Sequence, residues 1–152
     1  KVPYVNAIHG ALLPGRSVLL KGLVTRGREK RFQVNLGCGL LVEGTTVDDI
    51  ALHLNPRFDE RQVVLNSLID NMWGKEECYA SPFKPGDHVE IRILVTDSLF
   101  DIALNAKPFA TFKHQMSTQL IKTIYIKGDI ELDIIQYIDE DAVGFLFNYR
   151  LS

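Results

Sequence analysis

Short runs of alternating apolar and polar residues recur along this chain at intervals of about ten residues. Between residues 89 and 95, for example, Val89, Ile91, Ile93 and Val95 occupy every second position. Successive side chains on a strand point to opposite faces, so this alternation is typical of strands with one buried face. Gly, Pro, Asp and Asn separate most runs, which indicates an antiparallel sandwich or barrel rather than a parallel sheet with crossover helices. The expected strands are residues 17–24, 31–36, 50–58, 63–67, 88–96, 99–104, 109–112, 123–126 and 130–138.

The length and composition suit one such domain. A chain of 152 residues can bury about two thirds of its unfolded surface. Its 46% hydrophobic and 24% charged residues are ordinary for a globular protein. A jelly roll, in which two sheets pack face to face, is one way in which all-β proteins protect the unpaired edges of their strands. We therefore expect an all-β fold, an antiparallel jelly-roll β-sandwich of two sheets without a substantial helix.

One of these runs, residues 50–58, carries polar side chains in a pattern that suits a ligand. His53, Asn55 and Arg57 stand at alternate positions with apolar residues or proline between them, so they project from one face of the strand. A guanidinium donates several N–H groups, a carboxamide donates and accepts, and a neutral imidazole can do either. Asn66 can join the row from the neighbouring antiparallel strand. Such a row suits a rigid polyhydroxylated ligand, and a sugar fits this description.

A second cluster follows at Trp73-Gly74-Lys75-Glu76. The only tryptophan of the chain stands three residues before Glu76, and strict alternation would place the two on opposite faces. A bulge at Gly74 would return both to one face. The indole then offers a flat wall for the C–H face of a sugar, and Glu76 can accept sugar hydroxyls and orient Arg57. Taken alone, a tryptophan is more often a core residue, and a histidine on a strand is more often a half-exposed polar residue. The interpretation as a binding site therefore rests on the spacing of these residues relative to one another.

These motifs resemble those of the galectins, which bind β-galactosides through His-x-Asn-x-Arg, then Val-x-Asn, then Trp-Gly-x-Glu-x-Arg. The corresponding residues here read His53-Leu-Asn55-Pro-Arg57, Val64-Leu-Asn66 and Trp73-Gly-Lys-Glu76-Glu-Cys78. The similarity extends to residues 13–15, 31–36, 82–86 and 109–114, and it spans residues 3–138. The joint order and spacing of these short motifs carry the resemblance.

The resemblance implies a β-galactoside-binding lectin domain that needs no cofactor. Its expected partners are β-galactoside glycans on glycoproteins or glycolipids. Galectins are made in the cytosol and exported without a signal peptide, so the resemblance implies a cytoplasmic and extracellular location. The residues that it assigns to galactose are His53, Asn55 and Arg57 for the ring hydroxyls, Asn66 and Glu76 for the hydroxymethyl group, and Trp73 for the apolar face.

Two departures from the family pattern bear on specificity. Cys78 stands where the pattern has a second arginine, which in the family helps to hold the glutamate and reaches the sugar beyond galactose. A thiol is a weak hydrogen-bond partner, so we expect weakened contacts to the second sugar, and we expect Cys78 itself to be half-buried. The segment after Arg57 is also short. Its Glu60 and Arg61 are accessory candidates together with Val64, and Arg61 is either a replacement cation or a solvated loop charge.

Charge and spacing disfavour other functions. A net charge of −2, with one basic run at residues 26–31, gives no case for binding nucleic acid or an anionic membrane, and a solvated hairpin turn accounts for the run. Glycoside hydrolysis needs two carboxyl groups about 5 to 10 Å apart across the sugar, whereas adjacent Glu76 and Glu77 point to opposite faces of a strand. The four histidines are scattered, so no metal cluster or nucleophile and base pair is visible.

We therefore expect a lectin rather than an enzyme, with no metal and no membrane insertion, since no apolar run is long enough to span a bilayer. The alternative is a galectin-fold protein-interaction module that has lost or altered its glycan specificity. Cys38 and Cys78 are too few for a disulfide framework and are expected to be free thiols.

The expected domain boundaries are 1–138 for the carbohydrate-recognition domain and 139–152 for a C-terminal extension. Phe145, Phe147 and Tyr149 make the extension more aromatic than a plain linker. It either packs on the domain or leads to a second domain, by analogy with tandem galectins.

Overall fold

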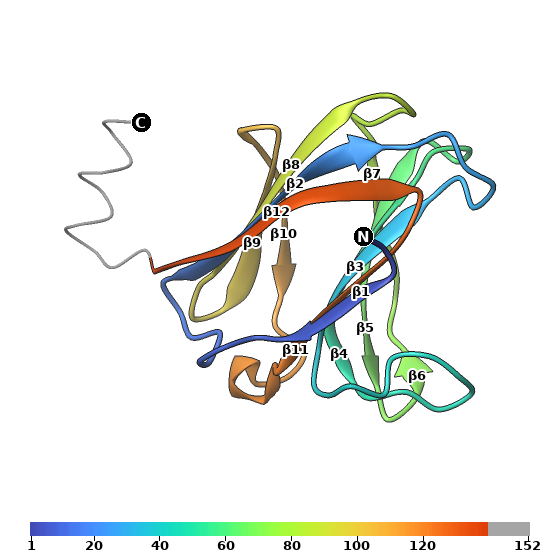
Figure 1. The fold of residues 1–152 in the computed structure, drawn as a ribbon. Helices are drawn as coiled ribbons and strands as arrows, with labels where there is room; N and C mark the ends of the chain where they lie inside the picture. The colour runs from blue at the N-terminus through green and yellow to red at the C-terminus, as the bar shows by residue number, and fades with distance from the viewer. Residues whose placement is uncertain (140–152) are drawn as a thin grey trace.

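The computed structural model describes residues 1–139, which form two antiparallel sheets packed face to face (Figure 1). The seven-stranded sheet has the order β1-β11-β3-β4-β5-β6, with β7 also paired to β5, and the five-stranded sheet has the order β10-β9-β8-β2-β12. The first sheet consists of β1 (Tyr4–Ala7), β3 (Phe32–Gly37), β4 (Ile50–Arg57), β5 (Gln62–Ile69), β6 (Met72–Trp73), β7 (Glu77–Ala80) and β11 (Thr123–Gly128). The second consists of β2 (Arg16–Val24), β8 (His88–Val95), β9 (Leu99–Leu104), β10 (Lys107–Lys113) and β12 (Ile130–Asp139).

The predicted all-β jelly-roll sandwich is confirmed, and each of the nine expected strands is present. The sequence analysis did not identify β1, β6 and β7, which are four, two and four residues long. Their residues are all exposed or half-buried, so they lack the buried alternate positions that mark the longer strands. One short 3₁₀ turn, η1 (Thr118–Leu120), precedes β11. No helix within residues 1–139 is long and apolar enough to cross a membrane. Beyond Asp139, the expected C-terminal extension lies outside the described residues.

The core lies between the two sheets and uses the apolar alternate positions of each strand. In β8 the burial pattern alternates along the strand, with Val89, Ile91, Ile93 and Val95 buried, as predicted. Each such side chain contributes about 1.5 to 3 kcal/mol when it is fully buried. The largest buried side chains include Leu20, Phe32, Leu54, Leu65, Phe100 and Ile102. The inward faces of β3, β4 and β5 are thus fixed by the core, and their other alternate positions must point away from it.

The register of the first sheet brings polar residues of three strands into one row. Asn35 of β3 lies opposite His53 of β4, and His53 lies opposite Asn66 of β5. Directly opposed residues of antiparallel strands share a face. The predicted row of polar side chains therefore continues across the sheet.

One extra residue separates β6 from β7 along their common neighbour β5. Trp73 pairs with Leu68 and Glu77 pairs with Leu65, so the three residues 74–76 face only residues 66 and 67. The amide of Gly74 donates to the carbonyl of Ser67 at 3.0 Å within this segment. The inserted residue has the effect that was expected of a bulge at Gly74, because it restores Trp73 and Glu76 to the same face of the sheet.

Candidate functional site

A groove of about 380 Å³ lies on the face of the first sheet that points away from the core. It extends over β3, β4 and β5 and is bounded by the segment from β6 to β7. The groove brings together all six residues that the sequence predicted for the site. Its lining consists of Arg31, Gln33, His53, Asn55, Arg57, Asn66, Trp73, Gly74 and Glu76.

His53 is held in one orientation at the floor of the groove. The residue is 8% exposed, and its Nδ1 lies 2.7 Å from Oδ1 of Asn35, whose Nδ2 donates in turn to Oε1 of Gln33 at 2.9 Å. This chain of bonds fits the tautomer with the proton on Nδ1, which leaves Nε2 as an acceptor. Burial, together with a smaller contribution from the positive charge of Arg57, lowers the pKa of His53 to about 4. The imidazole is therefore neutral at physiological pH.

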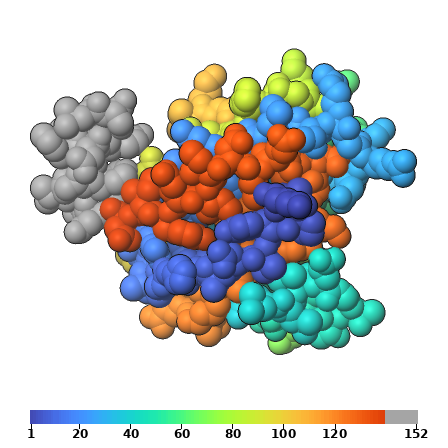
Figure 2. Space-filling model, viewed as in Figure 1, coloured from blue at the N-terminus to red at the C-terminus, as the bar shows by residue number. Residues whose placement is uncertain are grey.

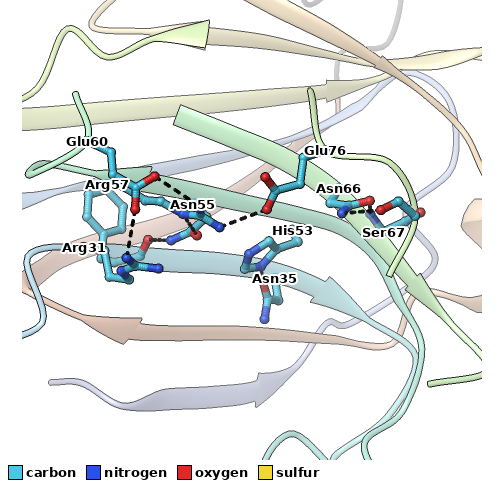
Figure 3. A network of polar contacts seen from close by, with 11 residues as sticks. Arg31, Asn35, His53, Asn55, Arg57, Glu60, Asn66, Ser67 and Glu76 are labelled. Atoms are coloured by element: carbon cyan, nitrogen blue, oxygen red, sulfur yellow. Dashed lines mark hydrogen bonds and ion pairs between the residues drawn. The ribbon is translucent and has the colours of Figure 1, made fainter. Parts of the chain in front are cut away.

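Asn55 and Arg57 form the centre of the polar network (Figure 3). The Asn55 amide donates to the carbonyl of Phe32 at 2.7 Å, and its Oδ1 accepts from Nε of Arg57 at 2.8 Å. The two terminal nitrogens of the guanidinium reach different carboxylates, at 3.3 Å for Glu60 and 3.1 Å for Glu76. Three bonds thus fix the plane of a side chain that is 18% exposed, and a fixed guanidinium is a directional donor.

Glu60 connects this network to a second cation, Arg31. Its other oxygen accepts from Arg31 at 3.3 Å, so Arg31, Glu60, Arg57 and Glu76 form a chain of alternating charge (Figure 3). Glu60, an accessory candidate from the sequence, thus belongs to this ion-pair network. Arg61 does not, since its side chain is exposed and makes no ion pair with Glu60 or Glu76. This exposure favours the interpretation of Arg61 as a solvated loop charge.

The other wall of the groove is formed by Asn66 and Trp73. The Asn66 amide donates to the carbonyl of Gly74 at 2.9 Å, and its Oδ1 accepts from the amide of Ser67 at 2.8 Å. The ring of Trp73 lies 4.7 Å from the imidazole of His53 between centroids, tilted by 53°. Trp73 is 52% exposed, so the indole is not a core residue. It presents an apolar surface to solvent beside hydrogen-bonding groups, which suits stacking on a sugar.

Val64 and Cys78 continue the sheet at the β7 side of the site. Asn55 lies opposite Val64, which lies opposite Cys78. Val64 is 1% exposed and is not among the residues that line the groove. Cys78 was expected to be half-buried, and this is wrong, because Cys78 is exposed. The reason is that β7 pairs only with β5 and leaves its other edge uncovered. Cys38 and Cys78 are both free thiols, as predicted.

The sequence analysis did not assign three polar residues to the site, namely Arg31 just before β3 and Gln33 and Asn35 within β3. Arg31 was assigned to a solvated turn, and neither Gln33 nor Asn35 was assigned to the site. The signal was present, since residues 31, 33 and 35 are polar at every second position of an expected strand, the same pattern as in residues 53–57.

The groove presents both hydrogen-bond donors and acceptors, which suits a ligand with hydroxyl groups. Arg57 and the amides donate, whereas Nε2 of His53 and the carboxylate of Glu76 accept. Within residues 1–139 no group of three or more His, Cys, Asp and Glu side chains could hold a metal ion.

Comparison with known proteins gives the same family at the levels of sequence and structure. The model of the galactoside-binding lectin family matches residues 3–137. The chain is 35% identical over 139 residues to galectin-4 of Rattus norvegicus and 34% identical over 140 residues to the 32 kDa beta-galactoside-binding lectin of Caenorhabditis elegans. Each alignment covers 90% of this chain. They cover 41% and 48% of the two relatives, so the chain spans less than half of their length.

Solved structures of similar proteins share the fold. Sheep galectin-11 in complex with glycerol has a TM-score of 0.79 at 27% identity, over 90% of this chain and 97% of that one. The galectin LEC-6 of Caenorhabditis elegans has a TM-score of 0.80 at 27% identity, over 91% of each chain. Since the family model covers nearly all the described residues, this chain belongs to the galactoside-binding lectins, the galectin family.

Proposed function

We propose that this chain binds terminal β-galactosides in the groove over β3, β4 and β5. Galectins are carbohydrate-binding lectins rather than enzymes. The observation that carries the proposal is the meeting, in one groove, of the six residues that the family motif would assign to galactose: His53, Asn55, Arg57, Asn66, Trp73 and Glu76.

The roles follow from the contacts of these residues. Arg57 is fixed by Asn55, Glu60 and Glu76, so it donates to a ring hydroxyl without first being ordered, and ordering a long side chain would cost affinity. His53 is neutral and offers Nε2 as an acceptor. Trp73 stacks on the apolar face of the ring. The bonds of Asn66 to Gly74 and Ser67 keep its amide beside Glu76, where both reach the hydroxymethyl group.

The second sugar is bound weakly in this proposal, because Cys78 replaces the arginine of the family pattern. Glu76 then has one cationic partner in the described chain, Arg57, at 3.1 Å. Its carboxylate is half exposed, and no cation from β7 reaches over the sugar that follows galactose. The affinity for a galactose disaccharide therefore comes mainly from the galactose ring.

Isothermal titration calorimetry with lactose, in buffer containing EDTA, tests the function. We expect saturable heat, since none of the proposed contacts uses a metal. No heat at millimolar lactose would instead favour the alternative, a galectin-fold protein-interaction module that has lost its glycan specificity.

The same proposal extends to the setting of the domain. Residues 1–138 form the recognition domain, its partners are galactose-ending glycans of glycoproteins or glycolipids, and it acts in the cytoplasm and, after export without a signal peptide, outside the cell. A second recognition domain in the natural protein is consistent with relatives that are more than twice as long as the aligned region.

A further inference from the structure

A second cavity, of about 350 Å³, lies at the end of the sandwich that is opposite the β3–β4 loop. Four connections meet there, and they follow β2, β4, β7 and β11. The connection between β2 and β3, light blue in the space-filling view, projects from this end of the molecule (Figure 2). The cavity is nearly as large as the sugar groove, and none of its lining residues lines that groove.

Backbone hydrogen bonds hold the walls of this cavity in place. The amide of Phe58 donates to the carbonyl of Lys30 at 2.8 Å, and the amide of Gly86 donates to the carbonyl of Val24 at 2.8 Å. Asp129 joins the remaining connection, because its amide donates to the carbonyl of Arg31 at 2.8 Å. Each of the four connections is thus bonded to another connection or to the end of β2, so a ligand would find the cavity formed and would lose little affinity to loop ordering.

The carboxylate of Asp129 is already used by the fold. Asp129 is 7% exposed, and its Oδ2 accepts from the amide of Lys30 at 2.8 Å. The position of Gly27 leaves no room for a Cβ against Oδ1 of the same carboxylate. Asp129 therefore anchors the β2–β3 connection and is not a free binding group.

The two basic side chains of the lining, in contrast, have no internal partner. Arg26 and Lys30 are exposed and make no ion pair with any residue in 1–139. Beside them, the half-buried Phe58 and Pro85 supply an apolar wall. Asp59 stands at the mouth as an exposed carboxylate. Unpaired cations next to an aromatic ring and a proline suit a ligand with an anionic head and an apolar body.

We propose that this cavity is a second binding site, which takes a carboxylate carried on an apolar or aromatic body. Arg26 and Lys30 bind the carboxylate, and the body packs against Phe58 and Pro85. A free organic acid and the C-terminus of an apolar peptide share this chemistry. The site does not depend on galactoside binding, and both sites are filled at the same time.

Titration with N-acetyl-phenylalanine, followed by the amide ¹H–¹⁵N spectrum, tests this site, with N-acetyl-phenylalanine amide as the uncharged control. We expect saturable shifts at residues 25–30, 58–59, 85–86 and 129, with at least about tenfold weaker binding of the amide because a charge-assisted bond is lost. Lactose at saturation leaves these shifts in place. A pentapeptide ending in phenylalanine with a free carboxylate separates the two sources, since tighter binding of the peptide identifies a protein C-terminus and equal binding a free acid.

Two double variants with the same change of charge identify the binding groups. Arg26→Gln with Lys30→Gln is expected to weaken binding about tenfold or more, whereas Arg28→Gln with Lys84→Gln, which lie outside the lining, leaves it unchanged. A dispersed amide spectrum shows that each variant is folded, whether or not lactose binds. Absence of shifts at 10 mM ligand, equal binding of acid and amide, or equal losses in the two double variants would overturn the proposal.

Discussion

Arg57 and Glu76 join the two sides of the groove through a single contact, in which a terminal nitrogen of the guanidinium lies 3.1 Å from Oε2 of the carboxylate. Arg57 ends β4, and Glu76 precedes β7. The pair therefore links the strand that carries His53 and Asn55 to the segment that carries Trp73. Any change to this contact is expected to alter sugar binding before it alters the fold, because both side chains lie outside the core.

Arg57→Ala is expected to abolish measurable lactose binding. The substitution removes the central donor and leaves Glu60 and Glu76 without their shared partner, a loss on the order of 2 kcal/mol or more. Calorimetry gives the affinity, and thermal unfolding reports the fold. Arg61→Ala is the matched control, since Arg61 is an exposed arginine of the next connection without a contact to the site. Equal affinity of the two variants would place the sugar elsewhere.

Trp73→Ala is expected to remove sugar binding while the thermal unfolding midpoint stays within a few degrees of wild type. The indole is half exposed, and its loss opens no cavity in the core, so the main effect is loss of the stacking wall. Met72→Ala, at a neighbour that is 72% exposed, controls for a general change at this edge. A glycan array of both variants measures the outcome, and retained galactoside signals for Trp73→Ala would contradict it.

Cys78→Arg is expected to tighten binding of lactose and N-acetyllactosamine more than binding of methyl β-galactoside. Cys78 lies two residues after Glu76, hence on the same face, and an arginine there can pair with Glu76 and donate to the second sugar. The gain is about 1 kcal/mol for a partly exposed charged bond. Competitive titration with the three sugars measures it. A strong disaccharide preference of wild type, without any gain in the variant, would show that the second sugar already has a partner.

The pKa of His53 predicts how stability depends on pH. In the unfolded chain a histidine takes up its proton near pH 6.5, whereas burial keeps His53 neutral in the fold down to about pH 4. Between these values the unfolded state binds more protons, so the free energy of unfolding falls as the pH falls, by about 3 kcal/mol at most from this group, and levels off below pH 4. Urea unfolding at pH 7 and pH 5 measures the difference.

His53→Gln should reduce that difference, and His88→Gln, an exposed site on β8, should leave it unchanged. Lactose affinity should be constant from pH 8 to pH 5, since His53 stays neutral over this range. A loss of lactose affinity centred near pH 6.5 would show that His53 is not shielded from water as described.

The sequence predicted the parts of this protein that follow from side-chain period. The nine longer strands and the shared face of His53, Asn55 and Arg57 are set by alternation over several residues, which the chain displays directly. The strands β6 and β7 escape such reasoning because they are short, and their place is fixed by pairing with β5 rather than by their own pattern.

The sequence motif does not predict contacts between segments that are distant along the chain. Arg31 and Glu60 are 29 residues apart, and only the antiparallel register of β3 and β4 brings them together. The exposure of Cys78 likewise depends on the uncovered edge of β7. The family pattern describes which residues meet the sugar, whereas the ion pairs that orient them come from the tertiary fold.

The emission of Trp73 during titration with lactose tests the central claim most directly, because Trp73 is the only tryptophan of the chain and lines the groove. Cellobiose is the control, since it differs from lactose only in the configuration of one hydroxyl on the non-reducing ring. We predict a saturable change in emission with lactose and none with cellobiose at the same concentration. An unchanged emission with lactose, or the same change with cellobiose, would contradict a galactoside site at this groove.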